Sequence, residues 1–246
     1  MEKPLNNTLT PGPSPSGRGG ATATLNRPIV VLYTANLRGD LDLLPRLHTF
    51  IRQLKNQTAD VENDVTICMV EPVLYRTLLL DLGNSCAAGV WHCDVTGGRS
   101  TLVVLDAMGY HAASVSGILT AQARARLEIS VALIDHAHTW QEDDVLITNG
   151  SRRGEPPVRP YGAHIVLSPA AATRVEGNTI YLAGVNAGQV GMAQVASVGG
   201  RLELTAHEVF DLPPRTPPDP TIAATVEFVL SEAQQYQRKL GNDAQS

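Results

Sequence analysis

Long apolar runs are missing from this chain. The run at residues 29–33 is among the longest, whereas a helix that crosses a bilayer needs roughly 20 consecutive apolar residues. Residues 1–20 also lack the apolar stretch on which a secretory signal depends. The sequence therefore predicts no membrane span and no export by the usual route, and we expect a cytoplasmic protein without a membrane partner.

Charged residues are also scarce. They make up 17% of the 246 residues, and 24 acidic side chains outnumber 19 basic ones to give a net charge of −5. A chain with this balance offers no broad electrostatic attraction to a polyanion, because such attraction needs an excess of Lys and Arg. We therefore expect no nucleic-acid partner.

Cysteine is the third scarce residue type. Cys68, Cys86 and Cys93 are an odd number in a chain too large to need a disulfide scaffold. Cys86, His92, Cys93 and Asp94 are close in sequence, but their spacing matches no common zinc motif and no second pair completes four ligands. The sequence predicts reduced thiols that are buried or half-buried.

The composition indicates one domain with short flanking segments. With 43% hydrophobic residues, the chain has enough apolar area for a substantial core. Residues 1–26 include a Pro/Gly/Ser-rich stretch that we expect to be disordered and that resembles a low-complexity element at the front of a bacterial gene. Residues 27–240 are predicted to form the domain, and residues 241–246 a polar tail.

The first half of that domain alternates strand-like and helix-like segments, which is typical of a layered α/β fold with parallel strands. Apolar β-branched runs predict the strands, and apolar residues at helical spacing predict the helices. The strands are expected at residues 27–33, 65–70, 75–81, 112–115 and 129–135, and the helices at residues 41–54, 100–108 and 120–127.

The second half changes to strands separated by Gly, Asn or Pro, which favours hairpins. Gly199 and Gly200 lie between two alternating runs and predict a two-residue turn, because both positions can take positive φ. An amphipathic helix is expected at residues 221–240. The strands are expected at residues 145–148, 164–167, 179–184, 191–198 and 201–210.

Three sequence blocks resemble the metal-binding blocks of calcineurin-like metallophosphoesterases of the 5′-nucleotidase branch. The first, VVLYTANLRG at residues 30–39, is similar to an apolar strand that runs into T-N-D-x-H-G. Asn36 stands where the family has a metal-binding Asp, and Arg38 stands where it has His. The residues around these two positions resemble the family, but the residues at the two ligand positions differ from it.

The other two blocks depart from the family in the same way. Residues 78–85, LLLDLGNS, resemble L-L-D-x-G-D-T, and Asn84 replaces the Asp that bridges two metals in the family. Residues 105–119, LDAMGYHAASVSGIL, resemble A-L-G-Y-D-A-V-T-x-G-N-H-E. In that block Gly117 replaces a ligand Asn, and Ile118 replaces the His that assists the leaving group.

The resemblance spans residues 27–240 and implies a single metallophosphatase-like α/β domain, a layered β-sandwich flanked by helices. In the family, two cations clamp the phosphate and activate water. Arg38 would place a fixed positive charge beside them. The repulsion from one dication at ~5 Å, with an effective dielectric constant of ~20, is roughly 7 kcal/mol. We therefore expect no two-metal centre and no cofactor.

One other segment could hold a metal. Asp135, His136 and His138 lie at the end of an expected strand and resemble the family motif G-H-x-H-T. Imidazoles two residues apart project to the same side of an extended chain, so with a carboxylate they could bind one divalent ion of Mn, Zn or Fe. The alternative is a polar loop with solvated histidines, since the motif comes earlier in the chain than in the family.

Asn36, Arg38 and Asn84 also have an interpretation that needs no metal. A guanidinium and amides at strand ends suit a phosphate or a carboxylate, so these residues are candidates for an anion site. In the alternative, Arg38 fills the space of the lost ions by forming a salt bridge. Its partner would then be Asp40, Asp81 or Asp106.

Three functions are compatible with these observations. The first is a pseudoenzyme, a degenerate phosphoesterase-like domain that binds a phosphorylated small molecule or a protein partner. The second is an active metal-dependent hydrolase of phosphomonoesters or phosphodiesters, with a rebuilt site around His136 and His138. The third is an architectural subunit that uses the second-half hairpins as an interface. Replacement of ligands in three separate blocks favours the first.

Overall fold

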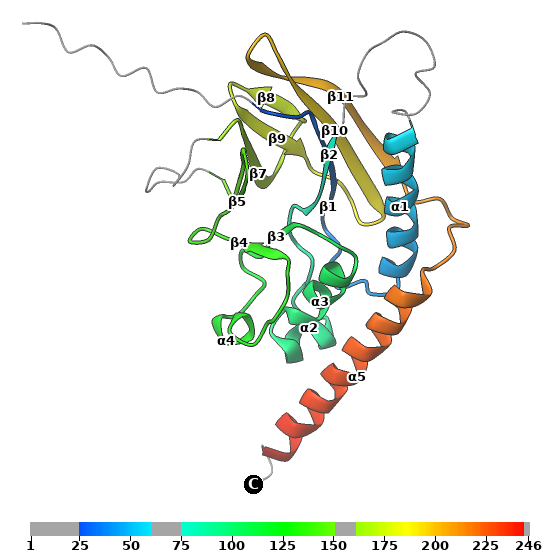
Figure 1. Cartoon of the computed structure of the whole chain (residues 1–246). Helices are drawn as coiled ribbons and strands as arrows, with labels where there is room; N and C mark the ends of the chain where they lie inside the picture. Colours follow the sequence, from blue (N-terminus) through cyan, green and yellow to red (C-terminus); the bar gives the residue numbers. More distant parts are fainter. Residues whose placement is uncertain (1–24, 61–74, 151–160, 244–246) are drawn as a thin grey trace, which may run out of the picture.

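The computed structural model describes residues 25–60, 75–150 and 161–243 (Figure 1). The expected strand at residues 65–70, and all of the expected N-terminal extension except its last two residues, lie outside the described residues. Among the described helices, none combines the length and apolar character needed to cross a membrane.

Two β-sheets form the centre of the fold. The first has six strands in the order β11-β10-β1-β2-β3-β4. Strands β1 to β4 run parallel, whereas β10 is antiparallel to β1 and to β11. The strands are β1 (Ile29–Thr34), β2 (Arg76–Asp81), β3 (Ala112–Ser114), β4 (Ala132–Ile134), β10 (Gln189–Val198) and β11 (Arg201–Asp211).

The second sheet comes mostly from the second half of the chain. Its five strands follow the order β5-β6-β7-β9-β8. Two pairs are antiparallel, β5 with β6 and β8 with β9. Strand β7 is parallel to both of its neighbours, β6 and β9. Hairpins therefore account for only part of this sheet. The strands are β5 (Trp140–Glu142), β6 (Val145–Thr148), β7 (Ala163–Ala170), β8 (Arg174–Glu176) and β9 (Thr179–Ala183).

Strand β1 lies between two cores because its side chains alternate. Ile29, Val31 and Tyr33 pack in the core shared with the second sheet. Val30 and Leu32 pack on the opposite face, in the core shared with the helices. Successive residues of a strand point to opposite faces, so a strand covered on both sides is apolar throughout. All six residues of β1 are buried.

The helices cover the other face of the six-stranded sheet. They are α1 (Leu44–Asp60), α2 (Trp91–Thr96), α3 (Arg99–Ala107), α4 (Ala121–Arg124) and α5 (Pro220–Asp243). In Figure 1, α5 runs from the start of α1 past α2 and α3 toward the C-terminus. Asp219 precedes and caps this helix, because its carboxylate accepts hydrogen bonds from the backbone N–H groups of Thr221 and Ile222, and Pro220 occupies the first helical position.

The layered α/β architecture predicted from the sequence is confirmed, with several corrections to its elements. The helix expected at residues 120–127 is a single turn, α4, and the strand expected at residues 129–135 is reduced to β4. Helix α2 and strands β5 and β8 are not predicted, because short elements carry too few residues for a periodic pattern. The Gly199–Gly200 turn is confirmed: Val198 pairs with Arg201, and both glycines have positive φ.

The prediction of reduced thiols is wrong for two of the three cysteines. Cys86 and Cys93 form a disulfide, although both are buried as expected. The loop after β2 folds back onto α2 and brings the two Cα atoms to 5.8 Å, within the range that a disulfide requires. A separation of seven residues in sequence does not reveal this fold-back. Cys68 lies outside the described residues.

Candidate functional site

The candidate site lies where β1 and β2 end. These two strands are parallel neighbours, so the loops that follow them leave the same edge of the sheet, where open α/β sheets commonly bind ligands. The loops stay paired beyond the strands: the backbone N–H groups of Asn36 and Arg38 donate to the carbonyls of Gly83 and Asn84 at 2.9 and 2.8 Å. The sequence blocks at residues 30–39 and 78–85 therefore form one structure.

Asn36, Arg38 and Asn84 share an unusual backbone conformation. Their φ angles are 57°, 53° and 58°, and they are three of the four non-glycine residues with positive φ in the described part of the chain. This left-handed conformation is tolerated by Asn and unfavourable for a longer side chain such as Arg. Strained positions of this kind cluster at functional sites, where the surrounding structure maintains them.

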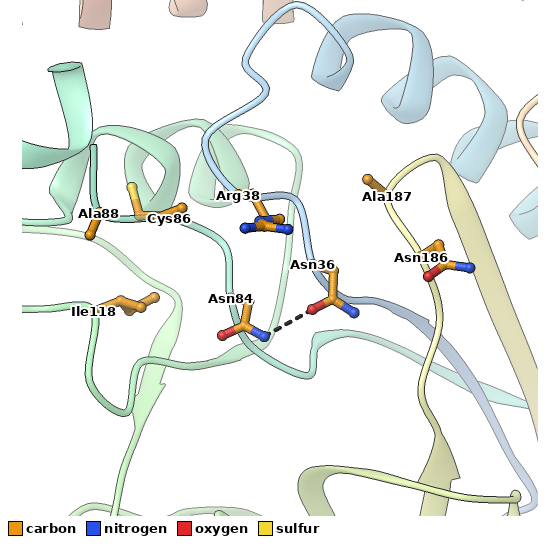
Figure 2. A pocket seen from close by; sticks show the side chains of 9 residues that line it. Asn36, Arg38, Asn84, Cys86, Ala88, Ile118, Asn186 and Ala187 are labelled. Atoms are coloured by element: carbon orange, nitrogen blue, oxygen red, sulfur yellow. Dashed lines mark hydrogen bonds between the residues drawn. The ribbon is translucent and has the colours of Figure 1, made fainter. Parts of the chain in front are cut away.

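These residues line a cavity of about 680 Å³. In Figure 2, Arg38 lies above the Asn36–Asn84 pair, with Ile118 and Ala88 on one side and Asn186 and Ala187 on the other. Among the described residues, no carboxylate and no imidazole lines the cavity. The lining residues are Asn36, Arg38, Asn84, Cys86, Ala87, Ala88, Ile118, Asn186 and Ala187.

The amides of Asn36 and Asn84 form a directed pair. Nδ2 of Asn84 donates to Oδ1 of Asn36 at 2.8 Å, and Nδ2 of Asn36 donates to the carbonyl oxygen of Val185 at 2.8 Å. A carboxylate at position 36 has no hydrogen to donate to Val185. Both bonds therefore depend on amide donors, which a carboxylate cannot supply. Within the described part of the chain, Oδ1 and one N–H of Asn84 are then left for a ligand.

Arg38 is exposed and makes no side-chain hydrogen bond or ion pair with another described residue. The carboxylates weighed as its partners are held elsewhere. Asp40 accepts from the backbone N–H of Leu43 at 3.2 Å, and Asp106 accepts from the backbone N–H of Ser130 at 2.8 Å. The guanidinium thus faces the cavity without a counter-charge from the described residues.

The third carboxylate, Asp81, is buried and does not line the cavity. It accepts hydrogen bonds from the backbone N–H of Gly83 at 3.2 Å and from the hydroxyl of Thr34 at 3.4 Å. Burial raises the pKa of Asp81 well above its usual range, although these hydrogen bonds lower it. Burial also raises the pKa of Tyr110, whose hydroxyl lies 2.9 Å from that of Thr34. Burial therefore disfavours the charged form of both groups.

The metal candidates Asp135, His136 and His138 lie after β4 and do not line this cavity. One oxygen of Asp135 accepts from Nδ1 of His138 at 2.8 Å, and the other pairs with Arg124 at 2.7 Å. Burial raises the pKa of Asp135, but hydrogen bonds from His138 and Ala137 and the charge of Arg124 outweigh it, so the pKa is lowered overall.

His136 and His138 are exposed. Within the described ranges, no group of three His, Cys, Asp or Glu side chains is placed to hold a metal ion. Asp135 serves instead as the acceptor that closes its own loop, since the backbone N–H groups of Ala137 and His138 donate to it.

Several lining residues are not identified from the sequence. Asn186 and Ala187 come from the loop between β9 and β10, which reaches the cavity because β10 pairs with β1. The only sequence signal there is a turn between Gly184 and Gly188. Ile118, noted as the replacement of a family His, forms part of the apolar wall.

Sequence and structure comparisons give one informative likeness. No family model matches the chain, and no curated protein matches it. Among solved structures, it is similar to the calcineurin-like phosphoesterase YfkN from Bacillus subtilis, with a TM-score of 0.50 and 11% sequence identity, over 86% of this chain and 99% of that chain. A likeness at this identity shows the fold, and the expected calcineurin-like phosphoesterase fold is confirmed.

The donors around the cavity do not fit the two cations that this fold implies. Metal ions of this type take carboxylate, imidazole and similar ligands. The described lining residues supply three amides and a guanidinium instead, and both side-chain functions of Asn36 are already hydrogen-bonded within the protein.

Proposed function

We propose that this chain is a degenerate phosphoesterase-fold domain, related to the 5′-nucleotidase branch, that binds a phosphorylated small molecule in the cytoplasm without two-metal hydrolysis. The observation that carries the proposal is the guanidinium of Arg38, which pairs with no other residue that the structure describes, above the Asn36–Asn84 amide pair. Guanidinium groups bind phosphate and carboxylate through several hydrogen bonds at once, and such charge-assisted bonds are among the stronger ones in proteins.

The charge around the cavity supports an anionic ligand. Arg38 is its only charged lining residue in the described chain, and burial disfavours the charged form of the nearby Asp81, which does not line the cavity. An anion would therefore meet one positive charge and no competing carboxylate there. Asn84 adds one N–H donor that is not used by any described residue.

The dimensions of the cavity support an organic ligand over a bare inorganic ion. A volume of about 680 Å³ falls in the range of about 300–1,000 Å³ typical of small-molecule sites. Ile118 and Ala88 provide an apolar wall opposite Asn186 (Figure 2). A molecule with one phosphate group and a partly apolar body matches this distribution of side chains.

The hydrogen-bonded amides support the proposal that this site does not carry out two-metal hydrolysis. Asn36 and Asn84 bind each other and the backbone of Val185, so the replaced ligands form a connected arrangement of their own. A metal ion at this position would have to break that arrangement and approach the fixed charge of Arg38.

Calorimetric titration of the purified protein tests the proposal. The ligands are inorganic phosphate, a phosphomonoester and a phosphodiester, and each titration is repeated with Arg38→Gln. Arg201→Gln is the matched control, because Arg201 is an exposed arginine at the tip of the β10–β11 hairpin. We expect binding by the wild type and by Arg201→Gln, and its loss in Arg38→Gln.

Elemental analysis and an aryl-phosphate hydrolysis assay complete the test. The protein is incubated with manganese, zinc or iron and desalted before both measurements. Stoichiometric metal together with metal-dependent turnover would overturn the proposal. Phosphate affinity that is unchanged in Arg38→Gln would remove the assigned anion site.

A further inference from the structure

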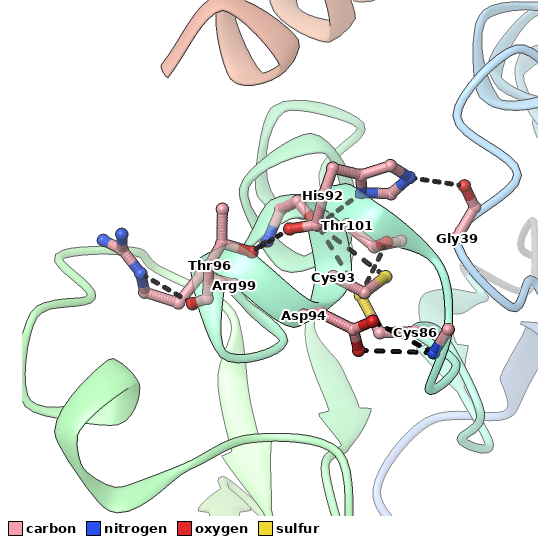
Figure 3. The surroundings of a disulfide bond; sticks show 10 residues. Gly39, Cys86, His92, Cys93, Asp94, Thr96, Arg99 and Thr101 are labelled. Carbon is pink, nitrogen blue, oxygen red and sulfur yellow. Dashed lines mark hydrogen bonds between the residues drawn. A yellow bond between two sulfur atoms is a disulfide. The ribbon is translucent and has the colours of Figure 1, made fainter. Parts of the chain in front are cut away.

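The Cys86–Cys93 disulfide is built into the wall of the proposed anion cavity. Cys86 lines the cavity and lies two residues after Asn84, whereas Cys93 lies on the short helix α2 (Figure 3). The disulfide therefore ties the loop that carries Asn84 to a separate element.

Cys93 also packs against the loop that carries Arg38. A Cβ atom added to Gly39 would lie 2.9 Å from Sγ of Cys93, so the backbone next to Arg38 rests directly on the disulfide. Nε2 of His92, the neighbour of Cys93, donates to the carbonyl oxygen of Gly39 at 3.0 Å, as Figure 3 shows. The helix that carries one sulfur thus holds the Arg38 loop by both packing and a hydrogen bond.

These contacts connect the loop that carries Arg38, the loop that carries Asn84 and helix α2 to one another. The backbone N–H of Gly39 donates to the carbonyl of Ser85 at 2.8 Å, and Ser85 precedes Cys86. The chain of contacts runs from Gly39 to Ser85, through Cys86 and its disulfide to Cys93, and back to Gly39. A change at the disulfide therefore acts on both loops that bear the anion-binding side chains.

A reductant has a route to the sulfur atoms. Cys86 and Cys93 are only 4% and 3% exposed, but both line a second cavity of about 200 Å³, and Cys86 lines the anion cavity as well. A disulfide in the cytoplasm is usually transient and catalytic or redox-sensing. The proposed cytoplasmic location makes a permanent structural role the less common one.

We propose that the Cys86–Cys93 disulfide is a redox switch for the anion cavity: the closed disulfide holds Arg38 and Asn84 in their binding positions, and reduction weakens ligand binding. This inference rests on the proposed function. Bonded sulfur atoms are about 2.05 Å apart, whereas atoms without a bond need van der Waals separation. When the disulfide is reduced, its two sulfur atoms must therefore move apart. In a close-packed interior, this movement displaces the neighbouring backbone at Gly39 or Ser85.

The reductant is a dithiol, either a protein with a Cys pair or a small molecule. One of its thiolates attacks a sulfur of the disulfide, forms a mixed disulfide and releases the other cysteine as a thiolate. Its second thiol then displaces the first protein sulfur. Two electrons and two protons pass to the protein, which gains two thiols, and the reductant becomes a disulfide.

The test compares the two redox states of one protein in a Cys68→Ser background, so that a single cysteine pair is left. A thiol-reactive chromogenic reagent counts free thiols with and without dithiothreitol, and calorimetry measures the affinity for inorganic phosphate in each state. We expect affinity at least about tenfold weaker, or about 1.4 kcal/mol, in the reduced form. A Cys86→Ser/Cys93→Ser variant should bind phosphate as weakly as the reduced form, and dithiothreitol should not change its affinity.

Two further outcomes separate this inference from the proposed function. Equal affinity in the two states, with the thiol count confirming reduction, overturns the switch and leaves the anion site. Failure of both states to bind inorganic phosphate, a phosphomonoester or a phosphodiester overturns the proposed function. Backbone hydrogen exchange at residues 36–40 and 84–90 then tests the switch alone, because it requires faster exchange after reduction and is overturned by unchanged rates.

Discussion

Nδ2 of Asn84 donates a 2.8 Å hydrogen bond to Oδ1 of Asn36, and this bond joins the ends of two parallel strands. The same two positions hold acidic metal ligands in the family that the sequence resembles. The contact has an amide donor on one side and an amide acceptor on the other. Two carboxylates could not form it without a shared cation or proton, so this link between the loops depends on the amides.

Asn36→Asp should destabilise the protein. The change removes the N–H that donates to the carbonyl of Val185 and places a carboxylate oxygen against that carbonyl. Leaving a part-buried acceptor unsatisfied costs about 1–3 kcal/mol, so the midpoint of urea unfolding should fall accordingly. Asn186→Asp is the control, because Asn186 is exposed on the same cavity. Equal stability of the two variants would contradict the assigned hydrogen bonds.

Gly39→Ala should impair both stability and phosphate binding. Gly39 has a φ of +82°, and an added Cβ would lie 2.9 Å from Cys93 and from Val90. Gly89→Ala is a closely matched control, since Gly89 has a φ of +83° and open space around its Cβ position. Both variants carry similar backbone strain of about 1–2 kcal/mol.

The difference between those two variants isolates packing against the disulfide. Unfolding free energy and phosphate affinity are measured for each. We expect Gly39→Ala to lose more of both, because overpacking adds about 1–3 kcal/mol. If the two variants behave alike, the Arg38 loop does not rest on Cys93 as the structure has it.

The sheets and the long helices can be predicted from the sequence because their patterns are local. The apolar run at β1 indicates a strand covered on both faces, and Leu44, Leu47 and Ile51 repeat at helical spacing in α1. Helix α2 has no such pattern, since its buried residues are His92, Cys93 and Thr96. Its position is set by the disulfide and by hydrogen bonds to Gly39 and Ser100, which the sequence does not indicate.

The candidate site is predictable only where a family block marks it. Asn36, Arg38 and Asn84 are identified because they stand at ligand positions of the resemblance, and the structure places all three around one cavity. Asn186 arrives from a loop about 100 residues later than Asn84 through the pairing of β10 with β1. No local pattern reveals such a contact, because tertiary pairing alone creates it.

Asp81→Asn should change how stability depends on pH. The folded-state pKa of Asp81 is raised by burial, so below the unfolded value of about 3.9 the carboxyl is protonated in both states and has no effect. As pH rises above that value, only the unfolded state ionises, and stability falls by at most about 1.4 kcal/mol per pH unit until the folded pKa is reached. The amide that replaces the carboxyl group does not ionise, and its oxygen can still accept the hydrogen bond from the backbone N–H of Gly83.

Urea unfolding at a series of pH values between 3 and 8 measures this effect as the difference between wild type and Asp81→Asn. The variant should gain stability relative to the wild type as pH rises. Asp42→Asn, at an exposed position, controls for the loss of one carboxyl group. A difference curve that is flat, or that rises toward acid, would show that Asp81 is ionised in the folded protein.

Restoring the family's ligands should restore metal binding. The variant Asn36→Asp, Arg38→His, Asn84→Asp, Gly117→Asn, Ile118→His removes the fixed positive charge and supplies the carboxylate, imidazole and amide donors that divalent ions prefer. We expect manganese to remain after desalting in elemental analysis. Manganese should also raise the unfolding free energy, by about 2.7 kcal/mol at a concentration 100-fold above its Kd.

The informative control retains Arg38 and carries the other four changes. It has the same two new carboxylates but keeps the guanidinium in place of an imidazole at position 38. Its failure to bind manganese would therefore assign the exclusion of metal to residue 38, where the repulsion of a dication by the guanidinium is roughly 7 kcal/mol at ~5 Å and a dielectric constant of ~20. If the full variant folds, as judged by circular dichroism, and still binds no metal, the loops after β1 and β2 lack metal-site geometry. The likeness to phosphoesterases would then extend to the sheets and end before the site, and the amide pair would be an arrangement in its own right, independent of any lost metal centre.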